Sequence, residues 1–196
     1  MSSREEILAR IRSNSQEAAP HPDLDQSWIT WPDPIARFEE SVTAVGGQAV
    51  RLENAEELTA AVTALEVYKS ADRVASCSTH TNLGGGALNE VDDPHTLEDL
   101  DLFIADGVLG VAENGAVWLT DESIAHRVAL FITQYLILTV ESRRIVNNMY
   151  EAYQQIQVGT PDFGVFISGP SKTADIEQSL VIGAHGARSL MVFIIG

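Results

Sequence analysis

The sequence is poor in cysteine and in basic residues. Its 196 residues include a single cysteine, Cys77, so this chain cannot form an internal disulfide. One thiolate is also fewer than the four that an iron–sulfur cluster normally needs. Lysine and arginine number 12 against 28 aspartates and glutamates, a formal net charge of −16. Because such a chain repels polyanions, we expect no nucleic acid or anionic membrane surface among its partners.

Long apolar runs are also missing. No stretch approaches the roughly 20 residues that a membrane span requires, and the longest run, around Tyr135–Val140, suits a buried strand. The first residues lack the basic-then-apolar order of a secretory signal. Apolar residues nevertheless make up 45% of the chain, enough to build a core. The composition therefore predicts a soluble, cytoplasmic protein without a membrane span.

The chain divides into an N-terminal segment, residues 1–34, and a domain, residues 35–196. Ser3 and Glu6 have the spacing of a capping box and predict a short helix with Ile7, Leu8 and Ile11 on one face. Four prolines then interrupt the stretch up to Pro34, which also carries Trp28 and Trp31. We expect an extended arm whose tryptophans pack on the domain or on a partner subunit.

Strand-like and helix-like segments alternate through the domain. Asp33-Pro34 has the pattern of a helix start, and the apolar periodicity predicts helices over 34–45, 54–69 and 142–157. Short apolar runs predict strands at 48–52, 74–77, 102–105, 107–112, 116–120, 136–140, 164–167, 180–182 and 190–195. Residues 122–131 fit either a helix or an irregular connection. This alternation predicts an α/β fold with helices layered on a sheet.

A polar loop follows the predicted strand 164–167. It carries small hydroxyl residues, a lysine and two carboxylates: Ser168, Gly169, Ser171, Lys172, Thr173, Asp175 and Glu177. Backbone N–H groups, hydroxyls and the lysine ammonium together suit a small carboxylate or phosphate, and ligands of α/β sheets gather beyond strand ends. A capped turn without a ligand explains the same residues equally well.

A tight turn joins two of the predicted strands at Glu113, Asn114 and Gly115. Asn-Gly is a strong hairpin signal, so a plain turn is favoured, although Glu113 could act there as a base or nucleophile. His185, between Gly183 and Gly186, is the best of the histidines for acid–base chemistry, although a hydrogen-bonded structural role is favoured for it. The histidines lack metal-ligand spacing, so no metal site is predicted.

Two further segments favour structural explanations. His80 lies near Cys77 and the glycines 84–86, but free cysteines are mostly buried and inert. The glycine triplet suits a flexible loop better than a phosphate loop. The acidic run between residues 90 and 101 is typical of a solvated face rather than a metal site.

From about Phe38 onward the sequence resembles the lactate utilization protein C family, the LUD domain. The resemblance rests on residues 93–95, 98–102 and 110–118 and, most specifically, on 167–177 and 180–188. It implies a Rossmann-like three-layer sandwich of the NagB/RpiA/CoA-transferase-like type. It also implies a role in oxidising L-lactate to pyruvate together with two iron–sulfur subunits. Those partners would hold the clusters that this chain, with its single cysteine, cannot.

Under this interpretation Lys172 and the 168–173 loop would bind the lactate carboxylate, and Glu113 or His185 would remove a proton. The alternative is an independent enzyme acting on a phosphosugar or acyl-CoA, because the Glu113 turn also resembles the nucleophile of class I CoA transferases. Those enzymes usually have serine where this chain has Ala112, and many LUD relatives have Thr or Ser in place of Asn114. A non-catalytic scaffold that docks through the arm is a third hypothesis, and homo-oligomerisation is left open.

Overall fold

A five-stranded parallel sheet forms the centre of the protein. The computed structural model describes residues 2–14, 19–24, 26–85, 88, 91–122, 124–157, 159, 162–174 and 180–196. All neighbouring strands of this sheet run parallel. Their order is β1 (Gln48–Leu52), β11 (Ser189–Ile195), β6 (Tyr135–Glu141), β3 (Leu102–Asp106) and β2 (Val74–Ser76).

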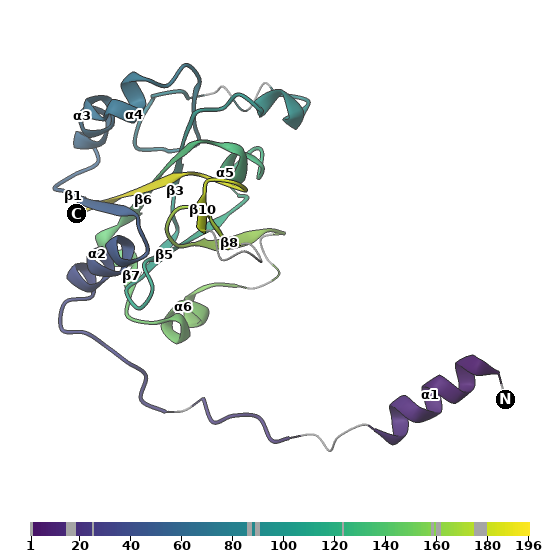
Figure 1. Ribbon diagram of the computed structural model, residues 1–196. Helices are drawn as coiled ribbons and strands as arrows, with labels where there is room; N and C mark the ends of the chain where they lie inside the picture. The colour runs from purple at the N-terminus through teal and green to yellow at the C-terminus, as the bar shows by residue number, and fades with distance from the viewer. Residues whose placement is uncertain are drawn as a thin grey trace.

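A second sheet and a small hairpin accompany the parallel sheet (Figure 1). The second sheet has the order β7 (Ile145–Val146), β4 (Leu109–Val111), β5 (Ala116–Thr120) and β8 (Gly164–Ile167). The hairpin pairs β9 (Lys172–Ala174) with β10 (Leu180–Ile182). The chain crosses from β3 to β4 at Gly107, where a Cβ atom would lie 2.3 Å from Val117 Cγ1 and 2.8 Å from Thr139 O. Glycine is therefore required at this crossing.

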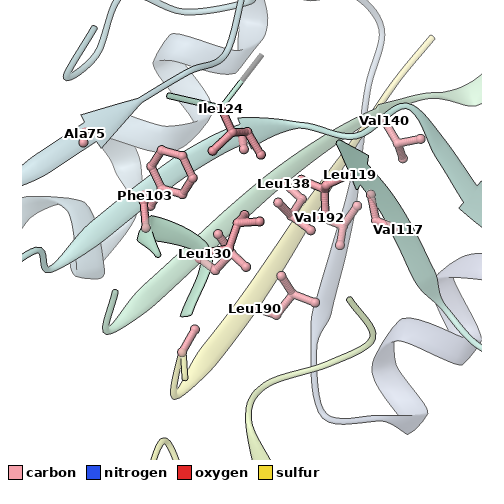
Figure 2. Packing of buried hydrophobic residues seen from close by; sticks show 14 of the residues in the cluster. Ala75, Phe103, Val117, Leu119, Ile124, Leu130, Leu138, Val140, Leu190 and Val192 are labelled. Carbon is pink, nitrogen blue, oxygen red and sulfur yellow. The ribbon is translucent and has the colours of Figure 1, made fainter. Parts of the chain in front are cut away.

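The main core lies between the two sheets. Alternate residues of the parallel strands point into it, such as Leu138 and Val140 of β6, which meet Val117 and Leu119 of β5 (Figure 2). Leu136 of β6 belongs to the same cluster. The opposite face of the same sheet packs on helices α3 (Glu57–Ala64) and α4 (Glu66–Lys69). A third cluster joins the second sheet to α6 (Met149–Gln155). The predicted α/β fold with layers on a parallel sheet is confirmed.

Several predicted elements form as the sequence indicates. Helix α2 (Pro34–Ala44) begins at Asp33, whose side chain accepts hydrogen bonds from the backbone N–H groups of Ile35 and Ala36. The Asn114-Gly115 turn joins antiparallel β4 and β5, with φ +67° at Gly115. Within the segment left open, the structure forms α5 (Ala129–Ile132).

Two predicted helices are wrong in part. The single helix over 54–69 is interrupted at Leu65, where the backbone is extended between α3 and α4. The helix over 142–157 is replaced at its start by a 3₁₀ turn (Ser142–Arg144) and by β7, because residues 145–146 pair with β4. A further 3₁₀ turn, Pro94–Leu97, precedes β3.

The N-terminal arm packs on the domain, as one of the two predicted alternatives requires. Trp28 stacks on Tyr150 with ring centroids 5.2 Å apart, and the backbone N–H of Trp31 donates to Asn147 Oδ1 at 2.8 Å. Helix α1 (Ser3–Ser13) lies away from the sheets and buries none of its residues (Figure 1). Its capping box uses Ser2 and Glu5, one residue earlier than predicted.

Candidate functional site

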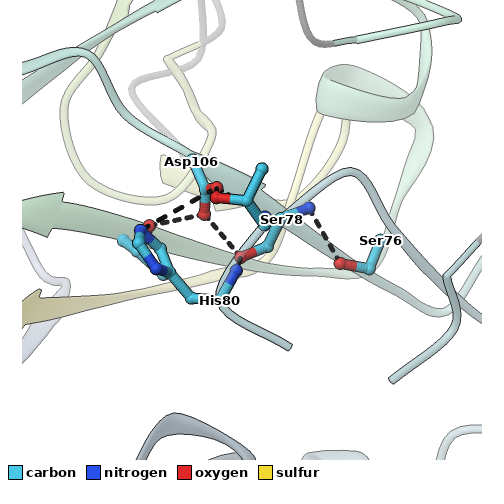
Figure 3. A network of polar contacts seen from close by, with 6 residues as sticks. Ser76, Ser78, His80 and Asp106 are labelled. Carbon is cyan, nitrogen blue, oxygen red and sulfur yellow. Dashed lines mark hydrogen bonds and ion pairs between the residues drawn. The ribbon is translucent and has the colours of Figure 1, made fainter. Parts of the chain in front are cut away.

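A network of polar side chains lies where three adjacent parallel strands end. Asp106 is the last residue of β3, and its neighbours in the sheet are β2 and β6. The loop after β2 folds over the end of β3, so that Ser78 and His80 face the Asp106 carboxylate (Figure 3). Thr79 of the same loop also donates to this carboxylate. We call Ser78, Thr79, His80, Asp106 and Thr139 the carboxyl-edge cluster.

Asp106 organises this cluster as a hydrogen-bond acceptor. Its carboxylate accepts from Ser78 Oγ at 2.5 Å and Thr139 Oγ1 at 2.7 Å through Oδ1, and from the Thr79 N–H at 2.7 Å and Oγ1 at 2.8 Å through Oδ2. Ser78 Oγ in turn accepts from the His80 N–H at 3.1 Å. Four donors on two oxygens occupy most of the acceptor capacity of a carboxylate, which fixes the loop.

The imidazole of His80 lies at the edge of this network. Its Nε2 atom is 4.0 Å from Asp106 Oδ2, and the side chains of His80 and Asp106 are 25% and 19% exposed. This separation is longer than a hydrogen bond, and neither ring nitrogen of His80 is hydrogen-bonded to another described residue, so the imidazole is available to another molecule.

The turn after β6 brings charged side chains to the same edge. Arg143 Nε donates to Glu141 Oε2 at 2.8 Å, and Arg144 Nε donates to Val108 O at 3.0 Å. The Arg143 hydrogen bond lowers the pKa of Glu141, and the positive charges of Arg143, His80 and Arg144 lower it further. His80 and the two arginines come from different loops, yet all three lower the pKa of the Glu141 carboxylate. They therefore lie in the same region, at the carboxyl edge of the sheet.

Cys77 precedes the cluster and is half-buried against the core. Burial raises the pKa of its thiol, a backbone hydrogen bond with Ala125 partly offsets this, and the negative charge of Asp106 raises the pKa as well. A thiol with a raised pKa is a poor nucleophile at neutral pH. This agrees with the inert role that the sequence indicates.

The structure brings two of the predicted site segments together. Ser168 Oγ donates to the Asn114 carbonyl oxygen at 2.7 Å, which ties the polar loop to the Glu113 turn. The Glu113 carboxylate accepts a 3.0 Å hydrogen bond from the Met149 N–H at the start of α6. A Cβ atom at Gly115 would lie 2.6 Å from Val42 N. These contacts give the turn a clear structural role.

Several of the predicted site residues line a cavity of ≈ 250 Å³. Ser168, Gly169, Ser171 and His185 line it beside apolar residues such as Phe131. Outside the cavity lining, Lys172 Nζ donates to the Val45 carbonyl oxygen at 2.6 Å, and Thr173 pairs with Val181 in the β9–β10 hairpin. Asp175 and Glu177 lie outside the described residues.

The polar loop after β8 does not lie beyond the carboxyl end of a strand of the parallel sheet, where the sequence predicted it. Strand β8, which precedes it, belongs to the second sheet and pairs antiparallel with β5. The Ser171 N–H donates to the Ala187 carbonyl oxygen at 2.8 Å, just before β11 begins, so the loop lies at the amino edge of the parallel sheet. The predicted site residues and the carboxyl-edge cluster are therefore at opposite edges.

Sequence reasoning missed most of the carboxyl-edge cluster. It named His80 only beside Cys77 and did not single out Asp106, Ser78, Thr79 or Thr139. The available signal was an aspartate ending one buried strand and a hydroxyl-rich loop following another. Among the described residues no group of three or more His, Cys, Asp or Glu side chains is arranged to hold a metal ion. In the same part of the chain no helix is long and apolar enough to cross a membrane.

Comparison with known proteins decides the family. Residues 94–195, just over half of the chain, match the LUD domain. The chain belongs to the LUD domain family. The matched segment of this LUD protein includes Asp106, Thr139 and the arginine turn after β6, whereas His80 precedes it.

Two named relatives align with part of the LUD protein. It is 35% identical over 94 residues to lactate utilization protein C of Shouchella clausii, covering 45% of this chain and 41% of that one. It is likewise 35% identical over 95 residues to lactate utilization protein C of Geobacillus thermodenitrificans, covering 45% and 40%. The aligned part thus spans less than half the length of these relatives.

A solved structure has a similar fold. The crystal structure of a DUF162 family protein from Deinococcus radiodurans superimposes with a TM-score of 0.63 over 83% of this chain and 96% of that one. The sequence identity is 17%, so this likeness concerns the fold alone.

Proposed function

We propose that this LUD protein takes part in lactate utilization. The observation that carries the proposal is the 35% identity, over 94 and 95 residues, to proteins named lactate utilization protein C. The alignments cover only 41% and 40% of those relatives, so what their names say of the whole protein comes to this chain only as a proposal.

We further propose that the protein works as a subunit of an iron–sulfur-dependent L-lactate oxidation complex. The oxidation of lactate to pyruvate releases two electrons, which need a carrier. This chain has one cysteine, while clusters are held by several thiolates. In the proposed complex two iron–sulfur subunits therefore hold the clusters, and this subunit handles the substrate or the assembly.

The carboxyl-edge cluster is the better-supported place for a substrate. Ligands of α/β sheets bind beyond the carboxyl ends of the parallel strands, where this cluster lies. The Glu113 carboxylate, in contrast, holds the start of α6 through the Met149 N–H. This contact favours a structural role for Glu113 over attack on an acyl-CoA.

A deletion strain tests the function. We expect it to grow poorly on L-lactate as sole carbon source and normally on pyruvate, and to recover when the intact chain is supplied. Co-purified iron–sulfur partners should reduce a dye in the presence of L-lactate only when this chain is included. Normal growth of the deletion strain on lactate would refute the proposal.

A further inference from the structure

Among the described residues of the carboxyl edge, most hydroxyl and backbone donors are already hydrogen-bonded, and the groups left for a ligand are an imidazole and guanidinium groups. The hydroxyls of Ser78, Thr79 and Thr139 all donate to Asp106. The loop's backbone donors are also used, since Ser78 N–H donates to Ser76 Oγ and Thr79 N–H to Asp106. The loop consequently offers no cradle of free N–H groups for a phosphate.

Arg143 pairs with Glu141 and is 80% exposed, which leaves the His80 imidazole and the Arg144 guanidinium as the better-held pair. Arg144 uses Nε to hold Val108 O, and its Nη atoms contact no hydrogen-bond acceptor among the described residues. Val108 follows Asp106 by two residues, so Arg144 is anchored directly beside the end of β3. His80 approaches the same strand end from β2, at 4.0 Å from Asp106.

We infer that His80 and Arg144 together bind a small 2-hydroxy acid, with Arg144 pairing its carboxylate and His80 hydrogen-bonding its hydroxyl. A planar guanidinium matches a carboxylate with two parallel hydrogen bonds. An imidazole N–H can donate a hydrogen bond to the oxygen of an adjacent hydroxyl. The choice of lactate among such acids rests on the proposed function.

In this arrangement Asp106 is a positioning residue. It holds the backbone of the His80 loop through Ser78 and Thr79, and it orients the imidazole without contacting the ligand. The arrangement also explains how a protein with a formal charge of −16 can bind an anion: the positive groups are local, at one strand end.

Three ligands separate the two contacts in the purified full-length protein. L-Lactate carries both groups, propionate lacks the hydroxyl, and L-lactamide lacks the negative charge. Ligand-observed NMR titration should show L-lactate binding about tenfold tighter than either analogue, since each analogue loses one hydrogen-bonding partner.

Variants assign each contact to its residue. Arg144→Met should weaken L-lactate binding about tenfold and abolish the preference for lactate over lactamide. His80→Ala should abolish the preference for lactate over propionate. Lys69→Met and His95→Ala are matched controls, since Lys69 pairs with Glu66 on α4 and His95 pairs with Asp93 on an exposed 3₁₀ turn. Thermal melts of all four variants show whether the fold is kept.

Equal binding of the three ligands by the wild-type protein would overturn the inference. So would His80→Ala and Arg144→Met variants that bind lactate as the controls do. Growth of the deletion strain on lactate is a separate readout: if growth is normal while binding follows the expected pattern, the proposed pathway fails and the hydroxy-acid site stands.

Discussion

Thr139 Oγ1 donates a 2.7 Å hydrogen bond to Asp106 Oδ1, and the two residues are also direct partners in the β3–β6 ladder. Thr139 is almost completely buried, at 1% exposure, whereas Asp106 is partly open to solvent. Strand pairing thus places a carboxylate at the sheet edge and supplies one of its donors. The loop after β2 supplies the others.

Replacing Asp106 should destabilise the protein measurably. Asp106→Asn puts an NH₂ group where two donors now point, so we expect the free energy of unfolding to fall by about 2 kcal/mol. Thr139→Val removes one donor and should cost about 1 kcal/mol. Urea denaturation measures both values. A loss in Asp106→Asn no larger than that in Thr139→Val would contradict the role given to Asp106.

Cys77 should react slowly with iodoacetamide in the folded protein. Burial and the charge of Asp106 raise the pKa of the thiol, so at pH 8 the reactive thiolate is scarcer than in the unfolded chain. The alkylation rate should climb as the pH rises past the ordinary cysteine value. Because Cys77 is the one cysteine of the sequence, mass spectrometry follows it without ambiguity. The protein in urea is the control, and equal rates in both states would disprove the prediction.

Gly115 should tolerate alanine badly. Its φ is +67°, and an added Cβ would lie 2.6 Å from Val42 N in the backbone of α2. Gly115→Ala should therefore cost about 3 kcal/mol, from strain and displacement together. Gly159→Ala is the matched control, because φ there is +92° with nothing within 4 Å of the added atom. That variant should lose about 1 kcal/mol. Similar thermal melts for the two variants would show that the close approach is unimportant.

Asn148 should control the accessibility of the arm. Its Nδ2 donates to the Ile29 carbonyl oxygen at 2.7 Å, while its Oδ1 caps α6 by accepting from the Glu151 N–H at 2.9 Å. Asn148→Ala should lose both contacts and about 2 kcal/mol of stability. Asn148→Ser keeps a capping oxygen but is too short to reach Ile29.

Limited chymotrypsin digestion reads out this contact. Cleavage after Trp28 should be faster in both Asn148 variants than in the wild-type protein, while the serine variant keeps more of its stability; the Trp31–Pro32 bond is not a chymotrypsin site. If the serine variant were cleaved at the wild-type rate, the Asn148 contact would not hold the arm.

The parts of the fold that local chemistry decides were predictable. Asp33 before Pro34 marked the start of α2, and Asn114-Gly115 marked the turn between β4 and β5, because caps and tight turns depend on residues within a few positions. The apolar run ending at Val140 likewise became the buried strand β6.

The parts that distant pairing decides were not predictable. Residues 145–146 have a helical periodicity with their neighbours, yet they form a strand because β4, more than thirty residues earlier, offers them a partner. The same holds for the candidate site. Asp106 acquires its donors from positions 27 to 33 residues away, and no spacing rule for adjacent residues reports that.

The crossing at Gly107 has a consequence for how the protein can vary. Asp106 is the last residue before the chain leaves one sheet for the other, and Gly107 is wedged between Val117 and the Thr139 carbonyl group. The position of Asp106 is thereby fixed relative to both sheets. Substitutions in the loops that carry His80 and Arg144 can therefore change ligand preference without moving Asp106. Asp106 itself can shift only if the two sheets move relative to each other.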